Sequence, residues 1–115
     1  MPFIEYYDFG EIVIDGVRYT RDLIITPKGV IANWWREEGH MLRVKDLKDV
    51  LNEDFEVLVI GTGYSGLMKV HPDVLEEMRR RGVEVIVRRT RDACKVHNEL
   101  CSRGRKVITA LHLTC

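Results

Sequence analysis

Residues 56–66 read EVLVIGTGYSG, from Glu56 to Gly66, and this stretch decides the fold. Four consecutive apolar residues between a charged residue and a glycine are typical of a strand that is buried on both faces of a sheet. The glycines that follow let the backbone turn sharply and leave amide N–H groups uncovered. Ligands of open α/β sheets bind outside the carboxyl ends of the strands, so this loop is the first candidate binding site.

Strand and helix patterns alternate after this stretch. A helix is predicted over residues 72–81 and a strand over residues 83–88. A second helix over residues 91–103 and a strand over residues 106–113 complete the chain. Alternation of this kind predicts a mostly parallel sheet with right-handed crossover connections.

The first third of the chain has the pattern of antiparallel strands. Asp15-Gly16 between two apolar runs is a hairpin signal, and residues 23–35 resemble a second hairpin that turns at residues 27–29. A short amphipathic helix is predicted over residues 46–51. We therefore expect a single α/β domain over residues 1–115, in which the N-terminal meander packs against the sheet or extends it.

Composition bounds the class of protein. The 115 residues are 45% hydrophobic and 31% charged, with a net charge of zero, which is typical of one globular domain. The sequence has no apolar run of the roughly 20 residues that a membrane helix needs, and its N-terminus lacks the basic and apolar regions of a signal peptide. We therefore expect a cytoplasmic protein that does not enter a membrane.

The charge is unevenly distributed along the chain. Residues 79–106 contain ten Lys and Arg against three acidic residues, which suits an anionic partner. Alternatively, the arginines at 79–81 are the solvated C-terminus of a helix, where cations complement the helix dipole. Nucleic acid is disfavoured as the partner, because the total charge lacks the positive surplus typical of nucleic-acid-binding proteins.

The spacing Gly61-x-Gly63-x-x-Gly66 matches a dinucleotide-binding fingerprint in its letters but not in its context. Residues 67–71 separate the third glycine from the predicted helix, and the next strand ends in two arginines instead of an acidic residue. A generic tight turn is the simplest interpretation, and a site for a carboxylate or a phosphate is the alternative. The residues expected to bind such an anion are Gly61, Thr62, Gly63, Tyr64, Ser65, Arg88 and Arg89.

Cys94, His97 and Cys101 lie on one face of a predicted helix. Zinc usually takes four ligands, and no Cys-x-x-Cys or His-x-x-x-His pair supports this set. Cys94 in the first helical turn, with His97 one turn later, also has the order of a nucleophile and its base. The favoured interpretation is that these cysteines face the core as free thiols. We therefore expect no metal, no cofactor and no catalytic residue.

Trp34 and Trp35 are adjacent, so on a strand their side chains point to opposite faces. One indole then packs in the core, and the other is either covered by a helix or exposed to a partner or ligand. The remaining histidines, His40, His71 and His112, show no mutual spacing that indicates a site.

Short motifs along the chain resemble those of a known family when they are taken in order. They are Phe9-Gly10-x-Ile12-x-Ile14-x-Gly16, Tyr19, Pro27-x-Gly29, Trp34, Gly61-Thr62-Gly63, Thr90-x-x-Ala93, Asn98-x-Leu100 and Arg105-x-Val107-x-x-Ala110-Leu111-His112. The arrangement resembles the small Mth-type domain family of archaeal and bacterial proteins. That family also includes mitochondrial complex I assembly factor 3 and the adipogenesis-associated Mth-type domain protein. The resemblance covers nearly the whole chain.

The resemblance implies a three-layer α/β domain with a mixed central sheet, mostly parallel with one antiparallel strand, plus an N-terminal β-meander. It supplies no catalytic residues. Because eukaryotic members of the family act through protein partners, it implies a non-enzymatic protein-interaction or assembly module, and we expect a monomer or a homodimer. The alternative function is a small anionic-ligand binder or an enzyme that uses the Gly61–Gly66 loop.

Overall fold

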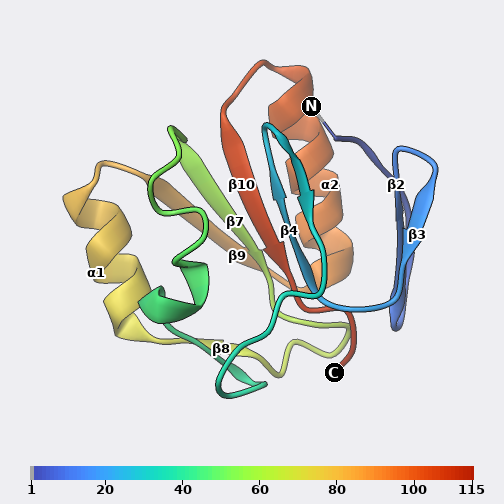
Figure 1. The fold of residues 1–115 in the computed structure, drawn as a ribbon, viewed down its shortest axis with the longest axis horizontal. Coiled ribbons are helices and arrows are strands. Elements are labelled where there is room, and N and C mark those ends of the chain that lie inside the picture. Colours follow the sequence, from blue (N-terminus) through green and yellow to red (C-terminus); the bar gives the residue numbers. More distant parts are fainter. Residues whose placement is uncertain (1) are drawn as a thin grey trace.

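The computed structural model describes residues 2–115. Within them the chain forms short strands, two α-helices and one 3-10 helix, η1 (Figure 1). In chain order the elements are β1 (Ile4–Asp8), β2 (Glu11–Ile14), β3 (Val17–Tyr19), β4 (Leu23–Thr26), β5 (Gly29–Ile31), β6 (Met41–Leu42), η1 (Val44–Leu47), β7 (Val57–Gly61), β8 (Lys69–Val70), α1 (Pro72–Arg80), β9 (Glu84–Arg88), α2 (Thr90–Ser102) and β10 (Val107–Leu111).

The centre of the molecule is a five-stranded mixed sheet with the order β5-β4-β10-β7-β9. β7 pairs in parallel with both β10 and β9, whereas β4 pairs antiparallel with both β10 and β5. β4 therefore runs against the other strands of this sheet, as the resemblance implies. β7 and β10 are buried along their whole length, which is why their sequences are continuous apolar runs.

Each face of the central sheet has its own hydrophobic core, because successive residues of a strand point to opposite faces. On one face Val59 of β7 belongs to the same buried cluster as Ala93 of α2. On the other face Leu58 of β7 shares a buried cluster with Val74 of α1. The two helices therefore cover opposite faces of the sheet (Figure 1).

The N-terminal strands are divided between two sheets. β1, β2 and β3 form a separate antiparallel sheet, whereas the β4–β5 hairpin extends the central sheet. Asn98 of α2 fixes the separate sheet, since its side-chain amide donates to the Ile4 carbonyl (2.7 Å) and accepts from the Ile4 N–H (2.9 Å). Nε2 of His97 donates to the Pro2 carbonyl (2.8 Å) beside it. The hairpin predicted at Asp15-Gly16 is thus confirmed as β2 and β3, whereas β1 was not predicted and the second predicted hairpin, β4 and β5, extends the central sheet.

The predicted boundaries of helices and strands agree better with the structure after residue 56 than before it. Predicted helices and strands beyond that residue differ from the observed ones by at most two residues at either end. The strand predicted to continue to residue 35 ends at Ile31, since Asn33 adopts a φ of 55°. The helix predicted over residues 46–51 is instead the shorter 3-10 helix η1. No helix within residues 2–115 is long and apolar enough to span a membrane.

Candidate functional site at the carboxyl edge of the sheet

The carboxyl ends of β7, β9 and β10 meet at one edge of the central sheet. Gly61, the last residue of β7, lies opposite Arg88 on one side and Leu111 on the other. Leu23, at the start of the antiparallel β4, lies beside Leu111 on the far side of β10. The predicted glycine-rich loop, the start of β4 and the residues after β10 are therefore neighbours.

The glycine-rich loop after β7 brings together the residues that were predicted to bind an anion. Arg89 donates from Nε and Nη2 to the Tyr64 carbonyl (3.1 and 2.7 Å). The hydroxyl of Thr62 donates to the Arg88 carbonyl (3.1 Å). The side chains of Tyr64 and Ser65 are exposed on the turn. These residues thus surround one turn, as the sequence predicted, and their ligand-binding role stays a prediction.

The backbone amides of this loop are engaged within the protein. Gly63 N donates to the hydroxyl of Thr90 (2.8 Å). Tyr64 N donates to the Thr114 carbonyl (2.7 Å), which belongs to the segment after β10. In this conformation the amides of Gly63 and Tyr64 are not available to an anion, because they already have acceptors.

Two of the glycines are required by close approaches of the protein's own chain. Gly63 has a φ of +113°, and a Cβ added there would lie 2.4 Å from the carbonyl carbon of Cys115. A Cβ at Gly61 would lie 2.7 Å from Cδ2 of Leu111 and 2.9 Å from the hydroxyl oxygen of Thr90. Real Cβ atoms do not pack this closely, so glycine is needed here by the fold itself.

A buried polar group lies at the same edge and consists of Asp22, Arg36 and His112, which we name the Asp22 cluster. Asp22 Oδ2 accepts from Nδ1 of His112 (2.7 Å) and from Nη2 of Arg36 (2.9 Å). Asp22 Oδ1 accepts from the backbone N–H of Leu113 (2.8 Å). Arg36 also donates from Nε and Nη2 to the Gly39 carbonyl (3.2 and 2.7 Å). The cluster thus joins the start of β4, the end of β10 and the loop after β5.

The electrostatics of the Asp22 cluster favour the ionised carboxylate. Burial raises the pKa of Asp22, but the hydrogen bonds from His112 and Leu113 and the charge of Arg36 together hold it below its ordinary value. Nη1 of Arg36 and Nε2 of His112 are buried without a hydrogen-bond partner among residues 2–115. Burying the charges of Asp22 and Arg36 costs desolvation free energy, which the ion pair and its hydrogen bonds offset only while the loop keeps this geometry. We infer that the cluster holds the loop of residues 32–40 in one conformation.

No motif in the sequence indicates the Asp22 cluster, and His112 shows no spacing that indicates a site. A signal does exist, since Asp22 directly precedes one buried strand and His112 directly follows another. These two positions become neighbours only when the two strands pair antiparallel, as Leu23 and Leu111 do. Strand pairing of this kind is not encoded in any local spacing, so the signal could not be used.

Two tryptophans in the loop after β5 have different environments. Trp34 is half-buried, and its Nε1 donates to the Asp46 carbonyl (2.8 Å) while its backbone N–H donates to the Asp22 carbonyl (2.8 Å). The guanidinium of Arg36 lies 4.6 Å from the centre of the Trp34 ring. Trp35, between these two anchored residues, is 76% exposed. Of the two alternatives left open for the second indole, burial under a helix is wrong and exposure is what the structure shows, although neither residue is in a strand.

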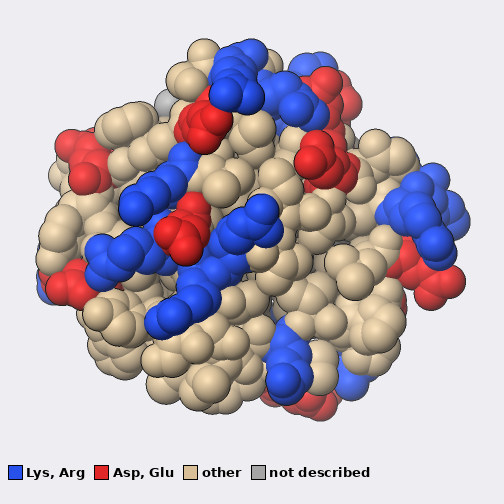
Figure 2. All heavy atoms as spheres, turned by 180° about the vertical axis from the view of Figure 1, so that it is seen from behind, with Lys and Arg blue, Asp and Glu red and all other residues tan. Residues whose placement is uncertain are grey.

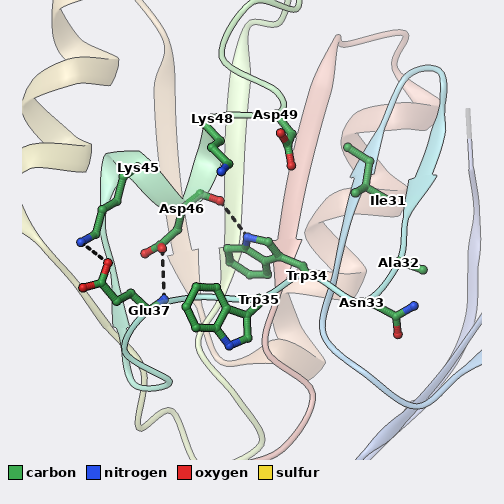
Figure 3. Close-up of a pocket in the computed structure, with 10 residues that line it drawn as sticks. All are labelled: Ile31, Ala32, Asn33, Trp34, Trp35, Glu37, Lys45, Asp46, Lys48 and Asp49. Carbon is green, nitrogen blue, oxygen red and sulfur yellow. Dashed lines mark hydrogen bonds and ion pairs between the residues drawn. The ribbon is translucent and has the colours of Figure 1, made fainter.

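The two indoles border a surface hollow of about 390 Å³, which we name the Trp35 hollow. Figure 3 shows Glu37 and Lys45 on one side of the indoles and Ile31 on the other. Glu37 pairs with Lys45 (2.5 Å), and its backbone N–H donates to the carboxylate of Asp46. A second hollow of about 300 Å³ shares Asn33 and both tryptophans with the first, so Trp35 projects between two depressions.

Cys94 and His97 of α2 are buried in the core. Nδ1 of His97 accepts from the hydroxyl of Thr109 (2.6 Å), and its Nε2 donates to the carbonyl of Pro2 (2.8 Å). Burial lowers the pKa of His97 and raises the pKa of Cys94 to about 12. A thiol with such a pKa is a poor nucleophile, and a histidine with both nitrogens bonded is not free to act as its base.

The fold and this edge define a class: small α/β domains with a mixed five-stranded sheet, a glycine-rich loop closed by the protein's own backbone, and an aromatic loop beside it. The chain belongs to the family described as "Protein of unknown function (DUF498/DUF598)", whose sequence model matches residues 4–112. The expected membership of the Mth-type family is thus confirmed.

Proteins similar to this chain include an assembly factor and several solved structures. NADH dehydrogenase (ubiquinone) 1 alpha subcomplex assembly factor 3 of Mus musculus is 31% identical over 119 residues, which cover 95% of this chain and 59% of that protein. The conserved hypothetical protein PH1505 of Pyrococcus horikoshii OT3 is 30% identical, with a TM-score of 0.82 and coverage of 97% and 98% of the two chains. A Mth938-like domain protein of Bordetella pertussis is 22% identical with a TM-score of 0.75, covers 97% and 85%, and shows the fold alone.

Proposed function

We propose that this protein is a non-enzymatic protein-interaction module of the assembly-factor type, and that Trp35 is the centre of its contact surface. The observation that carries the proposal is the 76% exposure of Trp35 between two anchored neighbours. Large apolar side chains at the surface of a soluble domain mark interaction sites when they are grouped beside a depression. The Trp35 hollow provides that depression.

The loop is suited to binding because its conformation is fixed before a partner arrives. Trp34 is tied to Asp46 and Asp22 by hydrogen bonds, and Arg36 is tied to Asp22 and Gly39. Association loses about 0.5–1.5 kcal/mol for each flexible side chain that it immobilises, and a fixed backbone reduces that loss. Tryptophan is also among the residues that contribute most to binding at interfaces.

The comparisons support the same class of function. The mouse relative is named as an assembly factor, and the similarity extends over 95% of this chain. This chain spans 59% of the length of that relative, so the partners of the whole relative are not assigned to this domain. We propose a cytoplasmic module that acts as a monomer or homodimer and binds at least one protein partner. Burial raises the pKa of the Cys94 thiol to about 12, which argues against Cys94 as a catalytic nucleophile.

The test compares Trp35→Ala with Val17→Ala, which removes another exposed apolar side chain from β3. Both variants and the unaltered protein are immobilised, bound proteins from the source cells are identified by mass spectrometry, and the strongest partner is purified. We expect Trp35→Ala to weaken affinity for that purified partner by about 30-fold or more, the effect of losing a strong interface residue. We expect Val17→Ala to bind like the unaltered protein. Equal affinity for Trp35→Ala would contradict the proposal.

A small anion at the glycine-rich loop is the second candidate function. The observation that favours it is the position of Arg89, which donates twice to the Tyr64 carbonyl and so stays beside the exposed hydroxyls of Tyr64 and Ser65. Thermal unfolding in the presence of phosphate, acetate and adenine nucleotides tests it. Under this alternative one of them raises the melting temperature, and Arg88→Ser removes the shift. No shift with any of these anions would remove the alternative.

A further inference from the structure

A second exposed surface combines aromatic and basic side chains, and it shares no residue with the Trp35 hollow. Its apolar part consists of Phe9, Tyr64 and Leu67, which are 54%, 40% and 52% exposed. The rings of Phe9 and Tyr64 meet edge to face with centroids 5.7 Å apart. We name this surface, together with the cations around it, the Tyr64 patch. Those cations are exposed and adjoin the glycine-rich loop or Arg91; they are Arg88, Arg89, Arg91 and Lys95. The carbonyl of Arg88 accepts from Thr62, and Lys95 lines a hollow with Arg91.

The patch is held together by contacts between its aromatic and basic members. The guanidinium of Arg91 lies 5.6 Å from the ring centre of Tyr64 and 5.7 Å from that of Tyr7. Arg89 lies along the glycine-rich loop, since its Cγ is 3.1 Å from where a Cβ of Gly66 would be. Its guanidinium is fixed on the Tyr64 carbonyl. The patch is therefore one ordered surface formed by the loop after β7, the start of α2 and the end of β1.

The cations of the patch differ from the other cations of the basic segment. Most basic residues between 79 and 106 have a carboxylate partner, and these are Arg79, Arg80, Arg81, Arg91, Arg103, Arg105 and Lys106. Arg88, Arg89 and Lys95 have none among residues 2–115. The unpaired cations of this segment thus all belong to the Tyr64 patch.

Figure 2 views the molecule from the side of α2 and shows Lys and Arg side chains gathered on this face, with an acidic side chain among them. The acids beside these cations are Asp92, Asp8, which pairs with Arg91 at 3.6 Å, and Glu5, which lines a hollow with Arg91 and Lys95. A residual positive charge remains over an exposed apolar surface. This combination attracts a carboxylate-rich segment and gives its apolar residues a place to pack.

We propose that the Tyr64 patch binds an acidic segment of a protein partner that also carries an aromatic or aliphatic residue. Carboxylates of the segment bind Arg88, Arg89 and Lys95, and its apolar side chain packs against Phe9 and Leu67. A nucleic acid is a poorer fit, because the chain has no net positive charge and the phosphates of the nucleic acid would meet the acids of the patch. A free small anion would leave the apolar part of the patch exposed. This second surface goes beyond the proposed function and lets the module hold two partner segments at once.

The test is a selection from a random 12-residue peptide library displayed on phage, with the unaltered protein as bait. We expect enriched peptides to carry several Asp or Glu residues and at least one Phe, Tyr, Trp or Leu. The most enriched peptide is then synthesised with a fluorophore, and its affinity is measured by fluorescence polarisation. Peptides without acidic enrichment, or no enrichment at all, would overturn the proposal.

Matched variants assign the binding to the patch. Arg88→Ser/Lys95→Ser removes two unpaired cations, whereas Arg79→Ser/Arg80→Ser removes the same charge from α1, where both arginines are paired with glutamates. We expect the first pair to weaken the peptide about tenfold or more and the second to change it less than threefold. Leu67→Ala is expected to weaken it as well, unlike Leu75→Ala, which alters an exposed leucine of α1. Equal effects of the matched variants would contradict the assignment.

Four further measurements separate this inference from its competitors. Thermal unfolding of each variant confirms that it is folded. In the first competition, a single-stranded oligonucleotide that displaces the labelled peptide at lower concentration than unlabelled peptide would assign the patch to nucleic acid. In the second, displacement of the peptide by millimolar acetate would assign the patch to a free anion. Trp35→Ala is expected to bind the peptide normally, so loss of binding by this variant would merge the two surfaces and overturn their independence.

Discussion

Two loops at the carboxyl edge of the central sheet show opposite relations between sequence and surface. The glycine-rich loop after β7 has the sequence of a ligand site, but its amides bind Thr90 and Thr114 of the same chain. The loop of residues 32–40 has no ligand-binding fingerprint beyond its adjacent tryptophans, yet it presents the indole of Trp35 to solvent. Glycines after a buried strand therefore indicate that another segment of backbone packs closely against them. That segment can belong to the protein itself and need not be a ligand.

The two loops are also held in different ways. The glycine-rich loop is fixed by backbone hydrogen bonds and by the absence of side chains at Gly61 and Gly63. The loop of residues 32–40 is fixed by buried charge, through Arg36 and Asp22. Backbone packing and buried charge respond differently to substitution and to pH, so the two mechanisms can be separated by experiment.

The largest effect is expected from breaking the Asp22 cluster. Asp22→Ala leaves the guanidinium of Arg36, which is 4% exposed, without its carboxylate. Removing one partner of a buried ion pair costs about 3–5 kcal/mol. We expect a loss of that size in the free energy of unfolding, measured by urea titration at neutral pH. Asp54→Ala breaks an exposed pair with Lys106 and is the control, with an expected loss within about 1 kcal/mol. Similar losses for both variants would mean that the cluster does not hold the loop.

A smaller loss is expected from the glycine-rich loop itself. Gly63→Val places a branched side chain at a φ of +113° and against the carbonyl carbon of Cys115. We expect a loss of about 2–3 kcal/mol, since the left-handed region costs a non-glycine residue about 1–2 kcal/mol and the collision adds to it. Gly16→Val is the control, because Gly16 has a φ of +80° with open space around it. Thermal unfolding compares the two, and an unchanged midpoint for Gly63→Val would overturn the structural role of this turn.

The sequence predicts the parts of this fold that rest on local pattern. β7, β10 and both α-helices were found because long apolar runs and helical periodicity are local properties of the chain. The pairing of β4 with β10 was not found, since it joins residues 23–26 with residues 107–111 and no local property specifies it. The paired β6 and β8 were missed because strands of two residues have no measurable period.

The candidate site, like the fold, was predictable only where it depends on local sequence pattern. The sequence correctly places the glycine-rich loop at the carboxyl end of β7, because the buried strand and its glycines mark that end, whereas ligand binding by the loop stays a prediction. It did not reveal that Thr114 occupies the amide of Tyr64, or that Asp22 and His112 meet. Both facts depend on where the last residues of the chain fold back, which is a tertiary property.

Acidification is expected to change the free energy of unfolding by a smaller amount, and to affect the loop of residues 32–40 but not the glycine-rich loop. The pKa of Asp22 is lower in the folded protein than its ordinary value, so the unfolded chain takes up this proton first as pH falls. The stability that Asp22 contributes is therefore complete above a pH of about 3.9 and is lost as pH falls through the folded pKa. No titrating side chain among residues 2–115 supplies the acceptors for the amides of Gly63 and Tyr64, which are a hydroxyl and a carbonyl.

We therefore expect the free energy of unfolding to fall less steeply below pH 4 in Asp22→Ala than in the unaltered protein. Urea titrations of both proteins between pH 5 and pH 3 measure this difference. The intrinsic fluorescence of the chain, which has two tryptophans, reports on the loop of residues 32–40 in the same samples. The same acid slope in both proteins would show that ionised Asp22 does not contribute to stability.

The smallest effect on stability is expected at the residue to which we assign the largest role in binding. Trp35→Ala removes a side chain that is 76% exposed, and substitutions of such residues usually change the free energy of unfolding by no more than about 0.5 kcal/mol. Trp34→Ala is the matched control one residue away, and it removes the hydrogen bond to Asp46 and the contact with Arg36. We expect that variant to lose about 2–3 kcal/mol, because it removes both packing and a buried hydrogen bond. Urea titration of the two variants decides the matter. A loss at Trp35 as large as that at Trp34 would mean that the exposed indole supports the fold, and the argument that it is held out for a partner would fail.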